Sequence, residues 1–263
     1  MNSHSLPNFK QTDAVRTIQL AKLSTRAPKH LQKDAIKKKT DGIIGELDEL
    51  QNLLYAESKH SVLVVLQGMD ASGKDGLVRD VFGKMNPQGV RVNAFKVPTA
   101  AEHAHDFLWR IHEQAPPKGM IEVFNRSHYE DILVTRVHGL CDDATAHKRM
   151  KAINDFEQLL YEHNNTHVLK CYLHISREEQ QLRLEERIKD PHKNWKYNKQ
   201  DLAESKLWKK YMQAYEDCFA NCSRIPWHII PADQNWYKDY VVATELLKLL
   251  KKLKMKFPKL AGK

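Results

Sequence analysis

The chain has 263 residues, 41% of them hydrophobic, which suits one large domain or one domain with extensions and argues against wholesale disorder. No apolar run approaches the length that spans a membrane, and the N-terminus lacks a charged-then-apolar leader, so we expect a cytoplasmic protein with no membrane partner. The net charge of +9 predicts attraction to polyanions, which include nucleic acid, nucleotides and long phosphate chains.

The first part of the chain divides into an irregular stretch and one helix. Residues 1 to about 28 show no clear pattern, whereas apolar residues recur at three- and four-residue steps between 29 and 55, which predicts an amphipathic helix. We expect residues 1–57 to form an N-terminal helical extension that packs on the main domain or on a partner subunit.

Short apolar strands alternate with helices over residues 58–263, the expected main domain. The predicted strands are 62–67, 90–96, 120–125, 167–175 and 227–231, and the predicted helices are 73–85, 99–114, 144–163 and 237–254. A polar stretch fills 126–139. Buried-type strands that alternate with helices are typical of a parallel sheet covered on both faces. The pattern therefore predicts a three-layer α/β fold with a five-stranded parallel sheet.

A glycine-rich turn follows the first strand of this domain. It has the form Gly-x-x-x-x-Gly-Lys and leads directly into a helix. Glycines let successive N–H groups and the helix N-terminus face a phosphate chain, and a lysine neutralises its charge. The sequence thus predicts a P-loop whose phosphate-binding residues are Gly68, Ala71, Ser72, Gly73, Lys74 and Asp75.

Two residues of this loop are unusual. Asp75 stands where a Walker-type loop has Ser or Thr, so the hydroxyl that ordinarily holds Mg²⁺ is missing. Asp70 places a carboxylate beside a bound polyanion, which would repel it unless a cation lies between them. We interpret Asp70 as a magnesium ligand or as a neighbour of the phosphate acceptor. The alternative is that Asp70 turns outward and only caps the loop.

A second polar patch follows the strand at 120–125. Because ligands bind beyond the carboxyl ends of strands in an open parallel sheet, this patch is expected to face the loop. Asn125, Arg126, Glu130 and Asp131 are therefore candidates for contacts with metal, phosphate or acceptor.

The stretch at about 176–200 is basic and aromatic, and it follows the fourth strand of the domain. Ser176 and Glu179 predict the start of a helix, on which Arg183 and Arg187 share one face. This pattern is similar to the lid of nucleotide kinases, whose arginines neutralise the phosphoryl group being transferred. The alternative is a solvated helix in which Arg183 pairs with Glu179 or Glu186.

Several motifs in this order resemble the second family of polyphosphate kinases. The resemblance covers roughly residues 30–250 and rests on the segments 68–75, 86–89, 96–99, 124–131, 195–197 and 231–237. It implies a thymidylate-kinase-like P-loop fold with a helical lid, Mg²⁺ as cofactor, and a homodimer or homotetramer. It also implies phosphoryl transfer between inorganic polyphosphate and AMP, ADP or ATP, with no nucleic-acid partner.

One position departs from the pattern of many family members, which carry Asp where this chain has Asn125. The change removes one possible metal carboxylate and leaves Asp70 as the expected metal ligand. Asn125 together with Glu130 resembles the class III subgroup, whose members phosphorylate both AMP and ADP.

The resemblance also implies roles for the candidate residues. The expected catalytic residues are Asp70, Lys74, Asn125, Arg126, Arg183 and Arg187; Lys96, Arg79 and Lys84 would line the polyphosphate path, and Arg126, Glu130 and Asp131 would bind the nucleotide. For Arg79 and Lys84, an exposed face of an ordinary helix is an equally good interpretation.

Two other functions fit parts of the sequence. An ATP-dependent nucleoside monophosphate kinase would use the same fold and lid. A basic nucleic-acid-binding protein with a vestigial P-loop would account for the charge, but it leaves the lid and Asp70 unexplained.

Overall fold

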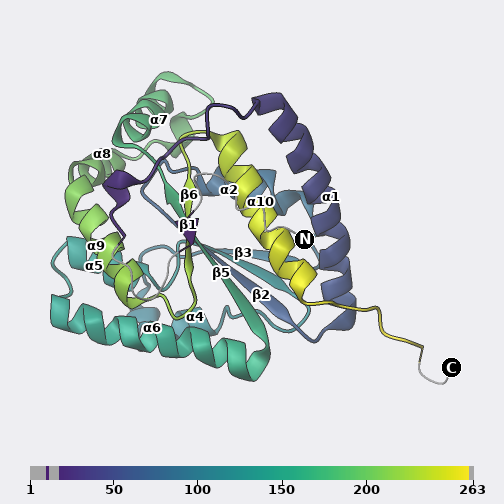
Figure 1. Cartoon of the computed structure of the whole chain (residues 1–263). Helices are drawn as coiled ribbons and strands as arrows, with labels where there is room; N and C mark the ends of the chain where they lie inside the picture. The colour runs from purple at the N-terminus through teal and green to yellow at the C-terminus, as the bar shows by residue number, and fades with distance from the viewer. Residues whose placement is uncertain (1–9, 12–17, 261–263) are drawn as a thin grey trace.

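Six strands form one sheet in the order β1-β6-β5-β2-β4-β3 in the computed structural model, which describes residues 10–11 and 18–260 (Figure 1). The strands are β1 Lys10–Gln11, β2 Ser61–Gln67, β3 Val90–Ala94, β4 Ile121–Asn125, β5 Thr166–His174 and β6 Trp227–Pro231. The five predicted strands are confirmed and are parallel to one another. β1 is an addition: it pairs antiparallel with β6, within a stretch predicted to be irregular.

The helices connect these strands and cover both faces of the sheet (Figure 1). They are α1 Lys33–Glu57, α2 Lys74–Asp80, α3 Ala100–His103, α4 Trp109–His112, α5 Glu130–Val137, α6 Asp143–Asn164, α7 Arg177–Lys189, α8 Lys199–Lys206, α9 Trp208–Asn221 and α10 Asn235–Lys252. Short 3-10 turns lie at Leu20–Lys22, Phe82–Lys84 and Asn194–Lys196.

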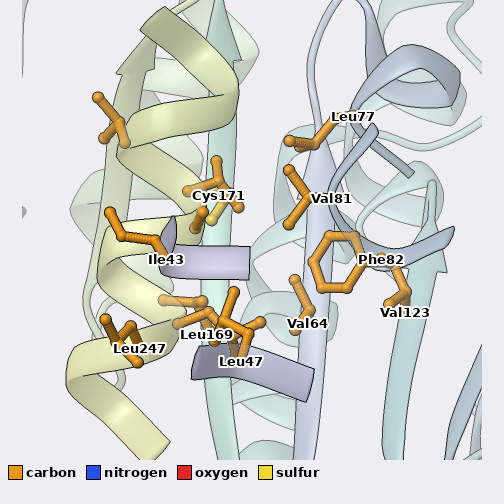
Figure 2. Packing of buried hydrophobic residues seen from close by; sticks show 14 of the residues in the cluster. Ile43, Leu47, Val64, Leu77, Val81, Phe82, Val123, Leu169, Cys171 and Leu247 are labelled. Atoms are coloured by element: carbon orange, nitrogen blue, oxygen red, sulfur yellow. The ribbon is translucent and has the colours of Figure 1, made fainter. Parts of the chain in front are cut away.

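Alternate residues of β2 enter two different cores, which confirms the three-layer prediction. Val64 packs with α1, α2 and α10 on one face, and Val65 packs with α5, α6 and α9 on the other. Figure 2 shows Ile43 of α1 and Leu247 of α10 reaching toward Leu169 of β5 in the first core. Because β2 is buried on both faces, its sequence is a continuous apolar run.

Helix α1 lies beside α10 and belongs to the same core as the central strands (Figure 1). Leu47 and Leu54 are fully buried there. Of the two expectations for this helix, packing on the main domain is the one seen. A domain boundary at residue 57 stays a prediction.

Four helical segments differ from the sequence prediction. The helix predicted over 73–85 ends as α2 at Asp80 and is followed by the 3-10 turn Phe82–Lys84. The helix predicted over 99–114 is divided into α3 and α4, because Asp106 accepts the N–H of Leu108 and forms a turn between them. α5 lies inside the stretch predicted only as polar. α8 and α9 fill a region for which no element was predicted.

The loops that follow the parallel strands meet at one edge of the sheet, where β2 lies between β5 and β4. Such an edge is where open α/β sheets bind ligands. Within the part of the chain that is described, no helix is both long and apolar enough to cross a bilayer.

Candidate active site

The loop after β2 is shaped by two glycines with positive φ. A Cβ on Gly68 would lie 2.9 Å from the Leu173 carbonyl oxygen, and a Cβ on Gly73 would lie 2.8 Å from Lys238 Nζ. Gly73 has φ of 94° and is the N-cap of α2. The glycine positions of the motif therefore have a steric cause, and the loop delivers its N–H groups to the start of a helix.

Lys74 opens α2 and is buried under the loop. Its Nζ donates to the carbonyl oxygens of Gly68, at 2.7 Å, and Met69, at 3.2 Å. Burial lowers the pKa of Lys74, and the neighbouring Asp70 carboxylate opposes the shift. The predicted phosphate lysine is thus held at the loop, with its charge balanced by backbone oxygens and the carboxylates of Asp70, Glu130 and Asp75.

Asp70 and Arg126 meet across the edge of the sheet. Arg126 Nη2 lies 2.8 Å from Asp70 Oδ1, and both side chains are partly exposed. The backbone of Arg126 has φ of 64°, and its N–H donates to the Leu66 carbonyl. A non-glycine residue in this conformation is uncommon and is often found at functional sites. The loop and the polar patch after β4 were predicted to face each other, and Asp70 and Arg126 bring them into contact.

Asn125 contacts the other unusual acid of the loop. Its Nδ2 donates to Asp75 Oδ1 at 2.8 Å. Burial alone would raise the pKa of Asp75, but the Asn125 amide and the nearby Lys74 outweigh it and hold that pKa below its usual range. Since an ionised carboxylate repels phosphate, this side chain would approach a phosphate only through a cation.

Glu130 and Asp131 open α5 but lie in different surroundings. Burial raises the pKa of Glu130, and the nearby Arg126 and Lys74 oppose the rise. Asp131 instead lies 3.7 Å from Arg110, and its pKa is also raised by burial. Neither of these two candidates for nucleotide contact lines the cleft: Glu130 lies near Arg126 and Lys74, and Asp131 lies near Arg110.

Helix α7 begins at Ser176, whose Oγ accepts the N–H of Glu179. The reciprocal half of the expected capping box is absent, because the N–H of Ser176 donates to Asp233 and the Glu179 carboxylate binds Arg183 instead. The alternative ion pair between Arg183 and Glu179 therefore exists. Arg183 also donates to the Ala71 carbonyl at 3.0 Å, so the same residue reaches the loop.

Arg187 lies one turn further along α7 and binds Asp201 of α8. Both residues line the same cleft as the loop. The two arginines predicted on one helix face thus have different surroundings: Arg183 is engaged with loop and backbone oxygens, and Arg187 with a single carboxylate.

A cleft of about 610 Å³ opens over the loop. It is bounded by the loop, the ends of β3 and β4, and the segment from α7 to α8. Its lining includes Asp70, Ala71, Ser72, Gly73, Lys74, Asp75, Arg79, Lys96, Asn125, Arg126, Arg183, Arg187, Lys193, Trp195, Lys196 and Asp201. The predicted phosphate-binding residue Gly68 is not part of this lining. Clustered cations and loop amides in one cleft are suited to a polyanionic ligand.

A family model described as Polyphosphate kinase 2 (PPK2) matches residues 30–258. The chain belongs to this family. The similar AMP/ADP-polyphosphate phosphotransferase of Meiothermus ruber is 49% identical over 214 residues, which are 81% of this chain and 80% of that protein. The ADP-polyphosphate phosphotransferase of Rhodopseudomonas palustris is 42% identical over 229 residues, which are 82% and 79% of the two chains.

A solved structure of this family has the same fold. The crystal structure of Polyphosphate Kinase 2 from Arthrobacter aurescens TC1 superposes with a TM-score of 0.90 at 43% identity, covering 94% of this chain and 89% of that one. The P-loop kinase fold predicted from the motifs is therefore confirmed, and the family membership shows that the chain is a kinase.

The three candidates for a polyphosphate path in this PPK2 chain are divided. Lys96 and Arg79 line the cleft, and Arg79 is paired with Asp80. Lys84 lies outside the cleft, in a neighbouring groove against α1, where its Nζ is 3.3 Å from Asp41. Lys84 is therefore not part of the cleft at the phosphate loop.

The donor set of the cleft fits Mg²⁺. Among residues 10–11 and 18–260, no three His, Cys, Asp or Glu side chains are grouped to hold a metal. Mg²⁺ is usually bound by one or two carboxylates together with substrate phosphates and water, rather than by an all-protein cage. Asp70 faces the cleft beside the loop amides and would supply such a carboxylate.

Two residues that contact the loop were not predicted. Gln180 donates to the Asp70 carbonyl at 3.0 Å, and Lys238 donates to the Gly73 carbonyl at 2.9 Å. Gln180 directly follows the helix-capping pair at Ser176 and Glu179. Lys238 directly follows the segment 231–237 of the family resemblance. These adjacencies were the available signals, but neither indicates that the side chain turns inward to the loop.

Proposed function

We propose that the protein transfers phosphoryl groups reversibly from inorganic polyphosphate to AMP and ADP, forming ADP and ATP. The observation that carries the proposal is the placement of Asp70 against Arg126 at the loop, in a chain 49% identical to a relative named AMP/ADP-polyphosphate phosphotransferase. The loop supplies donors for a phosphate chain, and the facing strand end supplies an arginine.

In the proposed reaction, Lys74 and the loop N–H groups hold the donor phosphates. Arg126 and Arg187 neutralise charge on the phosphoryl group as it moves. Mg²⁺ held by Asp70 and the phosphates would add to this neutralisation. An acceptor phosphate oxygen is already a nucleophile, so catalysis consists mainly of positioning and electrostatic stabilisation and needs no strong general base.

The acceptor range proposed here is that of class III. Glu130 lies where the charges of Arg126 and Lys74 act on it, close to the proposed reacting phosphates. Asn125 stands where many family members have a possible metal carboxylate, and here it donates a hydrogen bond to Asp75. We propose that Asn125 and Glu130 together allow the site to accept both AMP and ADP. We also propose that the protein works in the cytoplasm as a homodimer or homotetramer.

The test is an incubation of purified protein with ADP, Mg²⁺ and long-chain polyphosphate, with no other phosphoryl donor. The proposal predicts that ATP appears as polyphosphate is consumed. Transfer that occurs only from ATP to a nucleoside monophosphate would identify an ordinary nucleotide kinase instead. Salt-sensitive binding of DNA or RNA that persists in Lys74→Ala, without any transfer, would favour the nucleic-acid-binding alternative.

A further inference from the structure

The carbonyl oxygens of five residues of the phosphate loop accept hydrogen bonds from side chains. The Lys74 ammonium donates to the carbonyl oxygens of Gly68 and Met69. Those of Asp70, Ala71 and Gly73 accept from Gln180, Arg183 and Lys238, respectively. Gln180 and Lys238 do not line the cleft. Since a peptide plane that points its oxygen to one side points its N–H to the other, these two donors favour loop amides that face an anion in the cleft.

Lys238 is the most buried of the three charged donors. It lies in the first turns of α10, and its side chain is 1% exposed. Its Nζ lies 2.9 Å from the Gly73 oxygen, 3.1 Å from Asn235 Oδ1 and 3.5 Å from Asp239 Oδ1. Lys238 does not line the cleft, so it is behind the loop and out of reach of a ligand there.

This position is unfavourable for a cation in the absence of a ligand. Gly73 caps the N-terminus of α2, the end of a helix where positive charge is repelled. Burial lowers the pKa of Lys238, and the nearby Arg183 acts in the same direction, while Asp239 opposes both. A buried ammonium in such a place is costly to folding, whereas a polyanion bound on the other side of the loop would be stabilised by it.

We propose that Lys238 is a positioning residue for phosphate binding: it holds the Gly73 carbonyl together with the Leu77 N–H, and it adds positive charge behind the N-terminus of α2. The ligand that gains is a chain of phosphates, so the inference rests on the proposed function and deepens it. Asp239 sets the size of the effect, because its carboxylate lies next to the same ammonium.

The test measures binding of inorganic tripolyphosphate by calorimetry, without nucleotide, to the full chain and to Lys238→Met. Methionine keeps the length of the side chain and removes its charge and donors, so we expect about tenfold weaker binding. Lys252→Met, an exposed lysine at the end of the same helix, is the matched control and should bind as the unmodified chain does. A lowered melting temperature with unchanged affinity would show a purely structural role and overturn the inference.

A second variant has the opposite sign and remains decisive if Lys238→Met does not fold. Asp239→Asn removes a negative charge that lies 3.5 Å from the Lys238 ammonium. Because Asp239 also favours protonation of Lys238, the comparison is made at about pH 6, where tripolyphosphate should bind about threefold more tightly to the variant than to the unmodified chain. Weaker or unchanged binding by Asp239→Asn would overturn the inference. If the unmodified chain fails to bind tripolyphosphate, the proposed function falls with it; if the unmodified chain and Lys238→Met bind it equally, only the role of Lys238 falls.

Discussion

The phosphate loop, with the side chains packed against it, and the outer part of the lid, residues 186–201, hold their positive charges in different ways. Against the loop, Lys74 and Arg183 are bound mainly to backbone oxygens, and Lys238 is bound to the Gly73 carbonyl, Asn235 and Asp239. On the lid, Arg187 is bound to Asp201, and Lys193 and its partner Glu186 are 45% and 58% exposed. The loop is therefore built before a ligand arrives, while the lid cations can exchange a carboxylate for a phosphate.

The largest effect is expected for a change of Asp70, the loop carboxylate that faces the cleft. Asp70→Asn keeps the size of the side chain but removes the proposed metal ligand, so kcat should fall at least about 10³-fold. The melting temperature should change little, because Asp70 and its partner Arg126 are both partly exposed. Asp155→Asn, which changes a surface carboxylate paired with Arg224, is the control. Near-normal turnover in Asp70→Asn would remove Asp70 from the mechanism.

The two arginines of α7 test whether a cation bound to the loop and a cation of the lid have different roles. Arg187→Met removes an exchangeable charge, so kcat should fall about 10²-fold with little loss of stability. Arg183→Met removes a guanidinium that donates to the carbonyls of Ala71, Ala232 and Asp233, so the free energy of unfolding should fall by about 2 kcal/mol. Measuring kcat and urea unfolding for both variants decides the matter. The reverse pattern would break the distinction between loop and lid.

Glu122 lies outside both regions and tests whether the core titrates separately from the cleft. Burial raises its pKa to about 7, and Arg91 opposes the rise. Because the folded-state pKa is raised, the stabilising contribution is complete below about pH 4.5 and is lost as pH rises to about 7, a change of about 3 kcal/mol.

Glu122→Gln should therefore flatten the dependence of unfolding free energy on pH between 5 and 8. The pH profile of kcat should stay as it is in the unmodified chain, since Glu122 is a buried neighbour of Asn93 and does not line the cleft. A stability profile that keeps its slope in the variant would contradict the assignment.

The smallest effect is expected for a change of Lys196, a cation of the lid. Lys196 lines the cleft with its Nζ 5.0 Å from the centre of the Trp195 ring. Lys196→Met should raise KM for polyphosphate about threefold at low salt, and the difference should vanish at high salt, because charges near the surface are screened. Lys206→Met, at the exposed end of α8, should leave KM unchanged. A difference that persists at high salt would indicate a buried contact instead.

Much of the fold could be predicted because its central strands are buried on both faces. The run in β2 is apolar at every position from Val62 to Leu66, and such a run has few interpretations other than an inner strand. β1 could not be predicted, since two residues carry no period. α9 was missed although Tyr211, Tyr215 and Cys218 share one buried face, because charged residues between them mask the spacing.

The site could be predicted where a motif and the topology agree. Asp70, Lys74 and Arg126 were expected together because the ends of parallel strands share an edge, and they are. Residues whose role depends on side-chain direction could not be placed. Lys84 turns to Asp41 on α1 and Asp131 to Arg110, and both partners come from segments far away in the sequence.

The most direct measurement is a ³¹P NMR time course with AMP, Mg²⁺ and long-chain polyphosphate as the sole phosphoryl donor. Our account predicts that the β-phosphate signal of ADP appears first and the γ-phosphate signal of ATP follows, while the polyphosphate signal declines. A time course that stops at ADP would contradict the proposed acceptor range. A spectrum that changes only after ATP is added would contradict the proposed function itself.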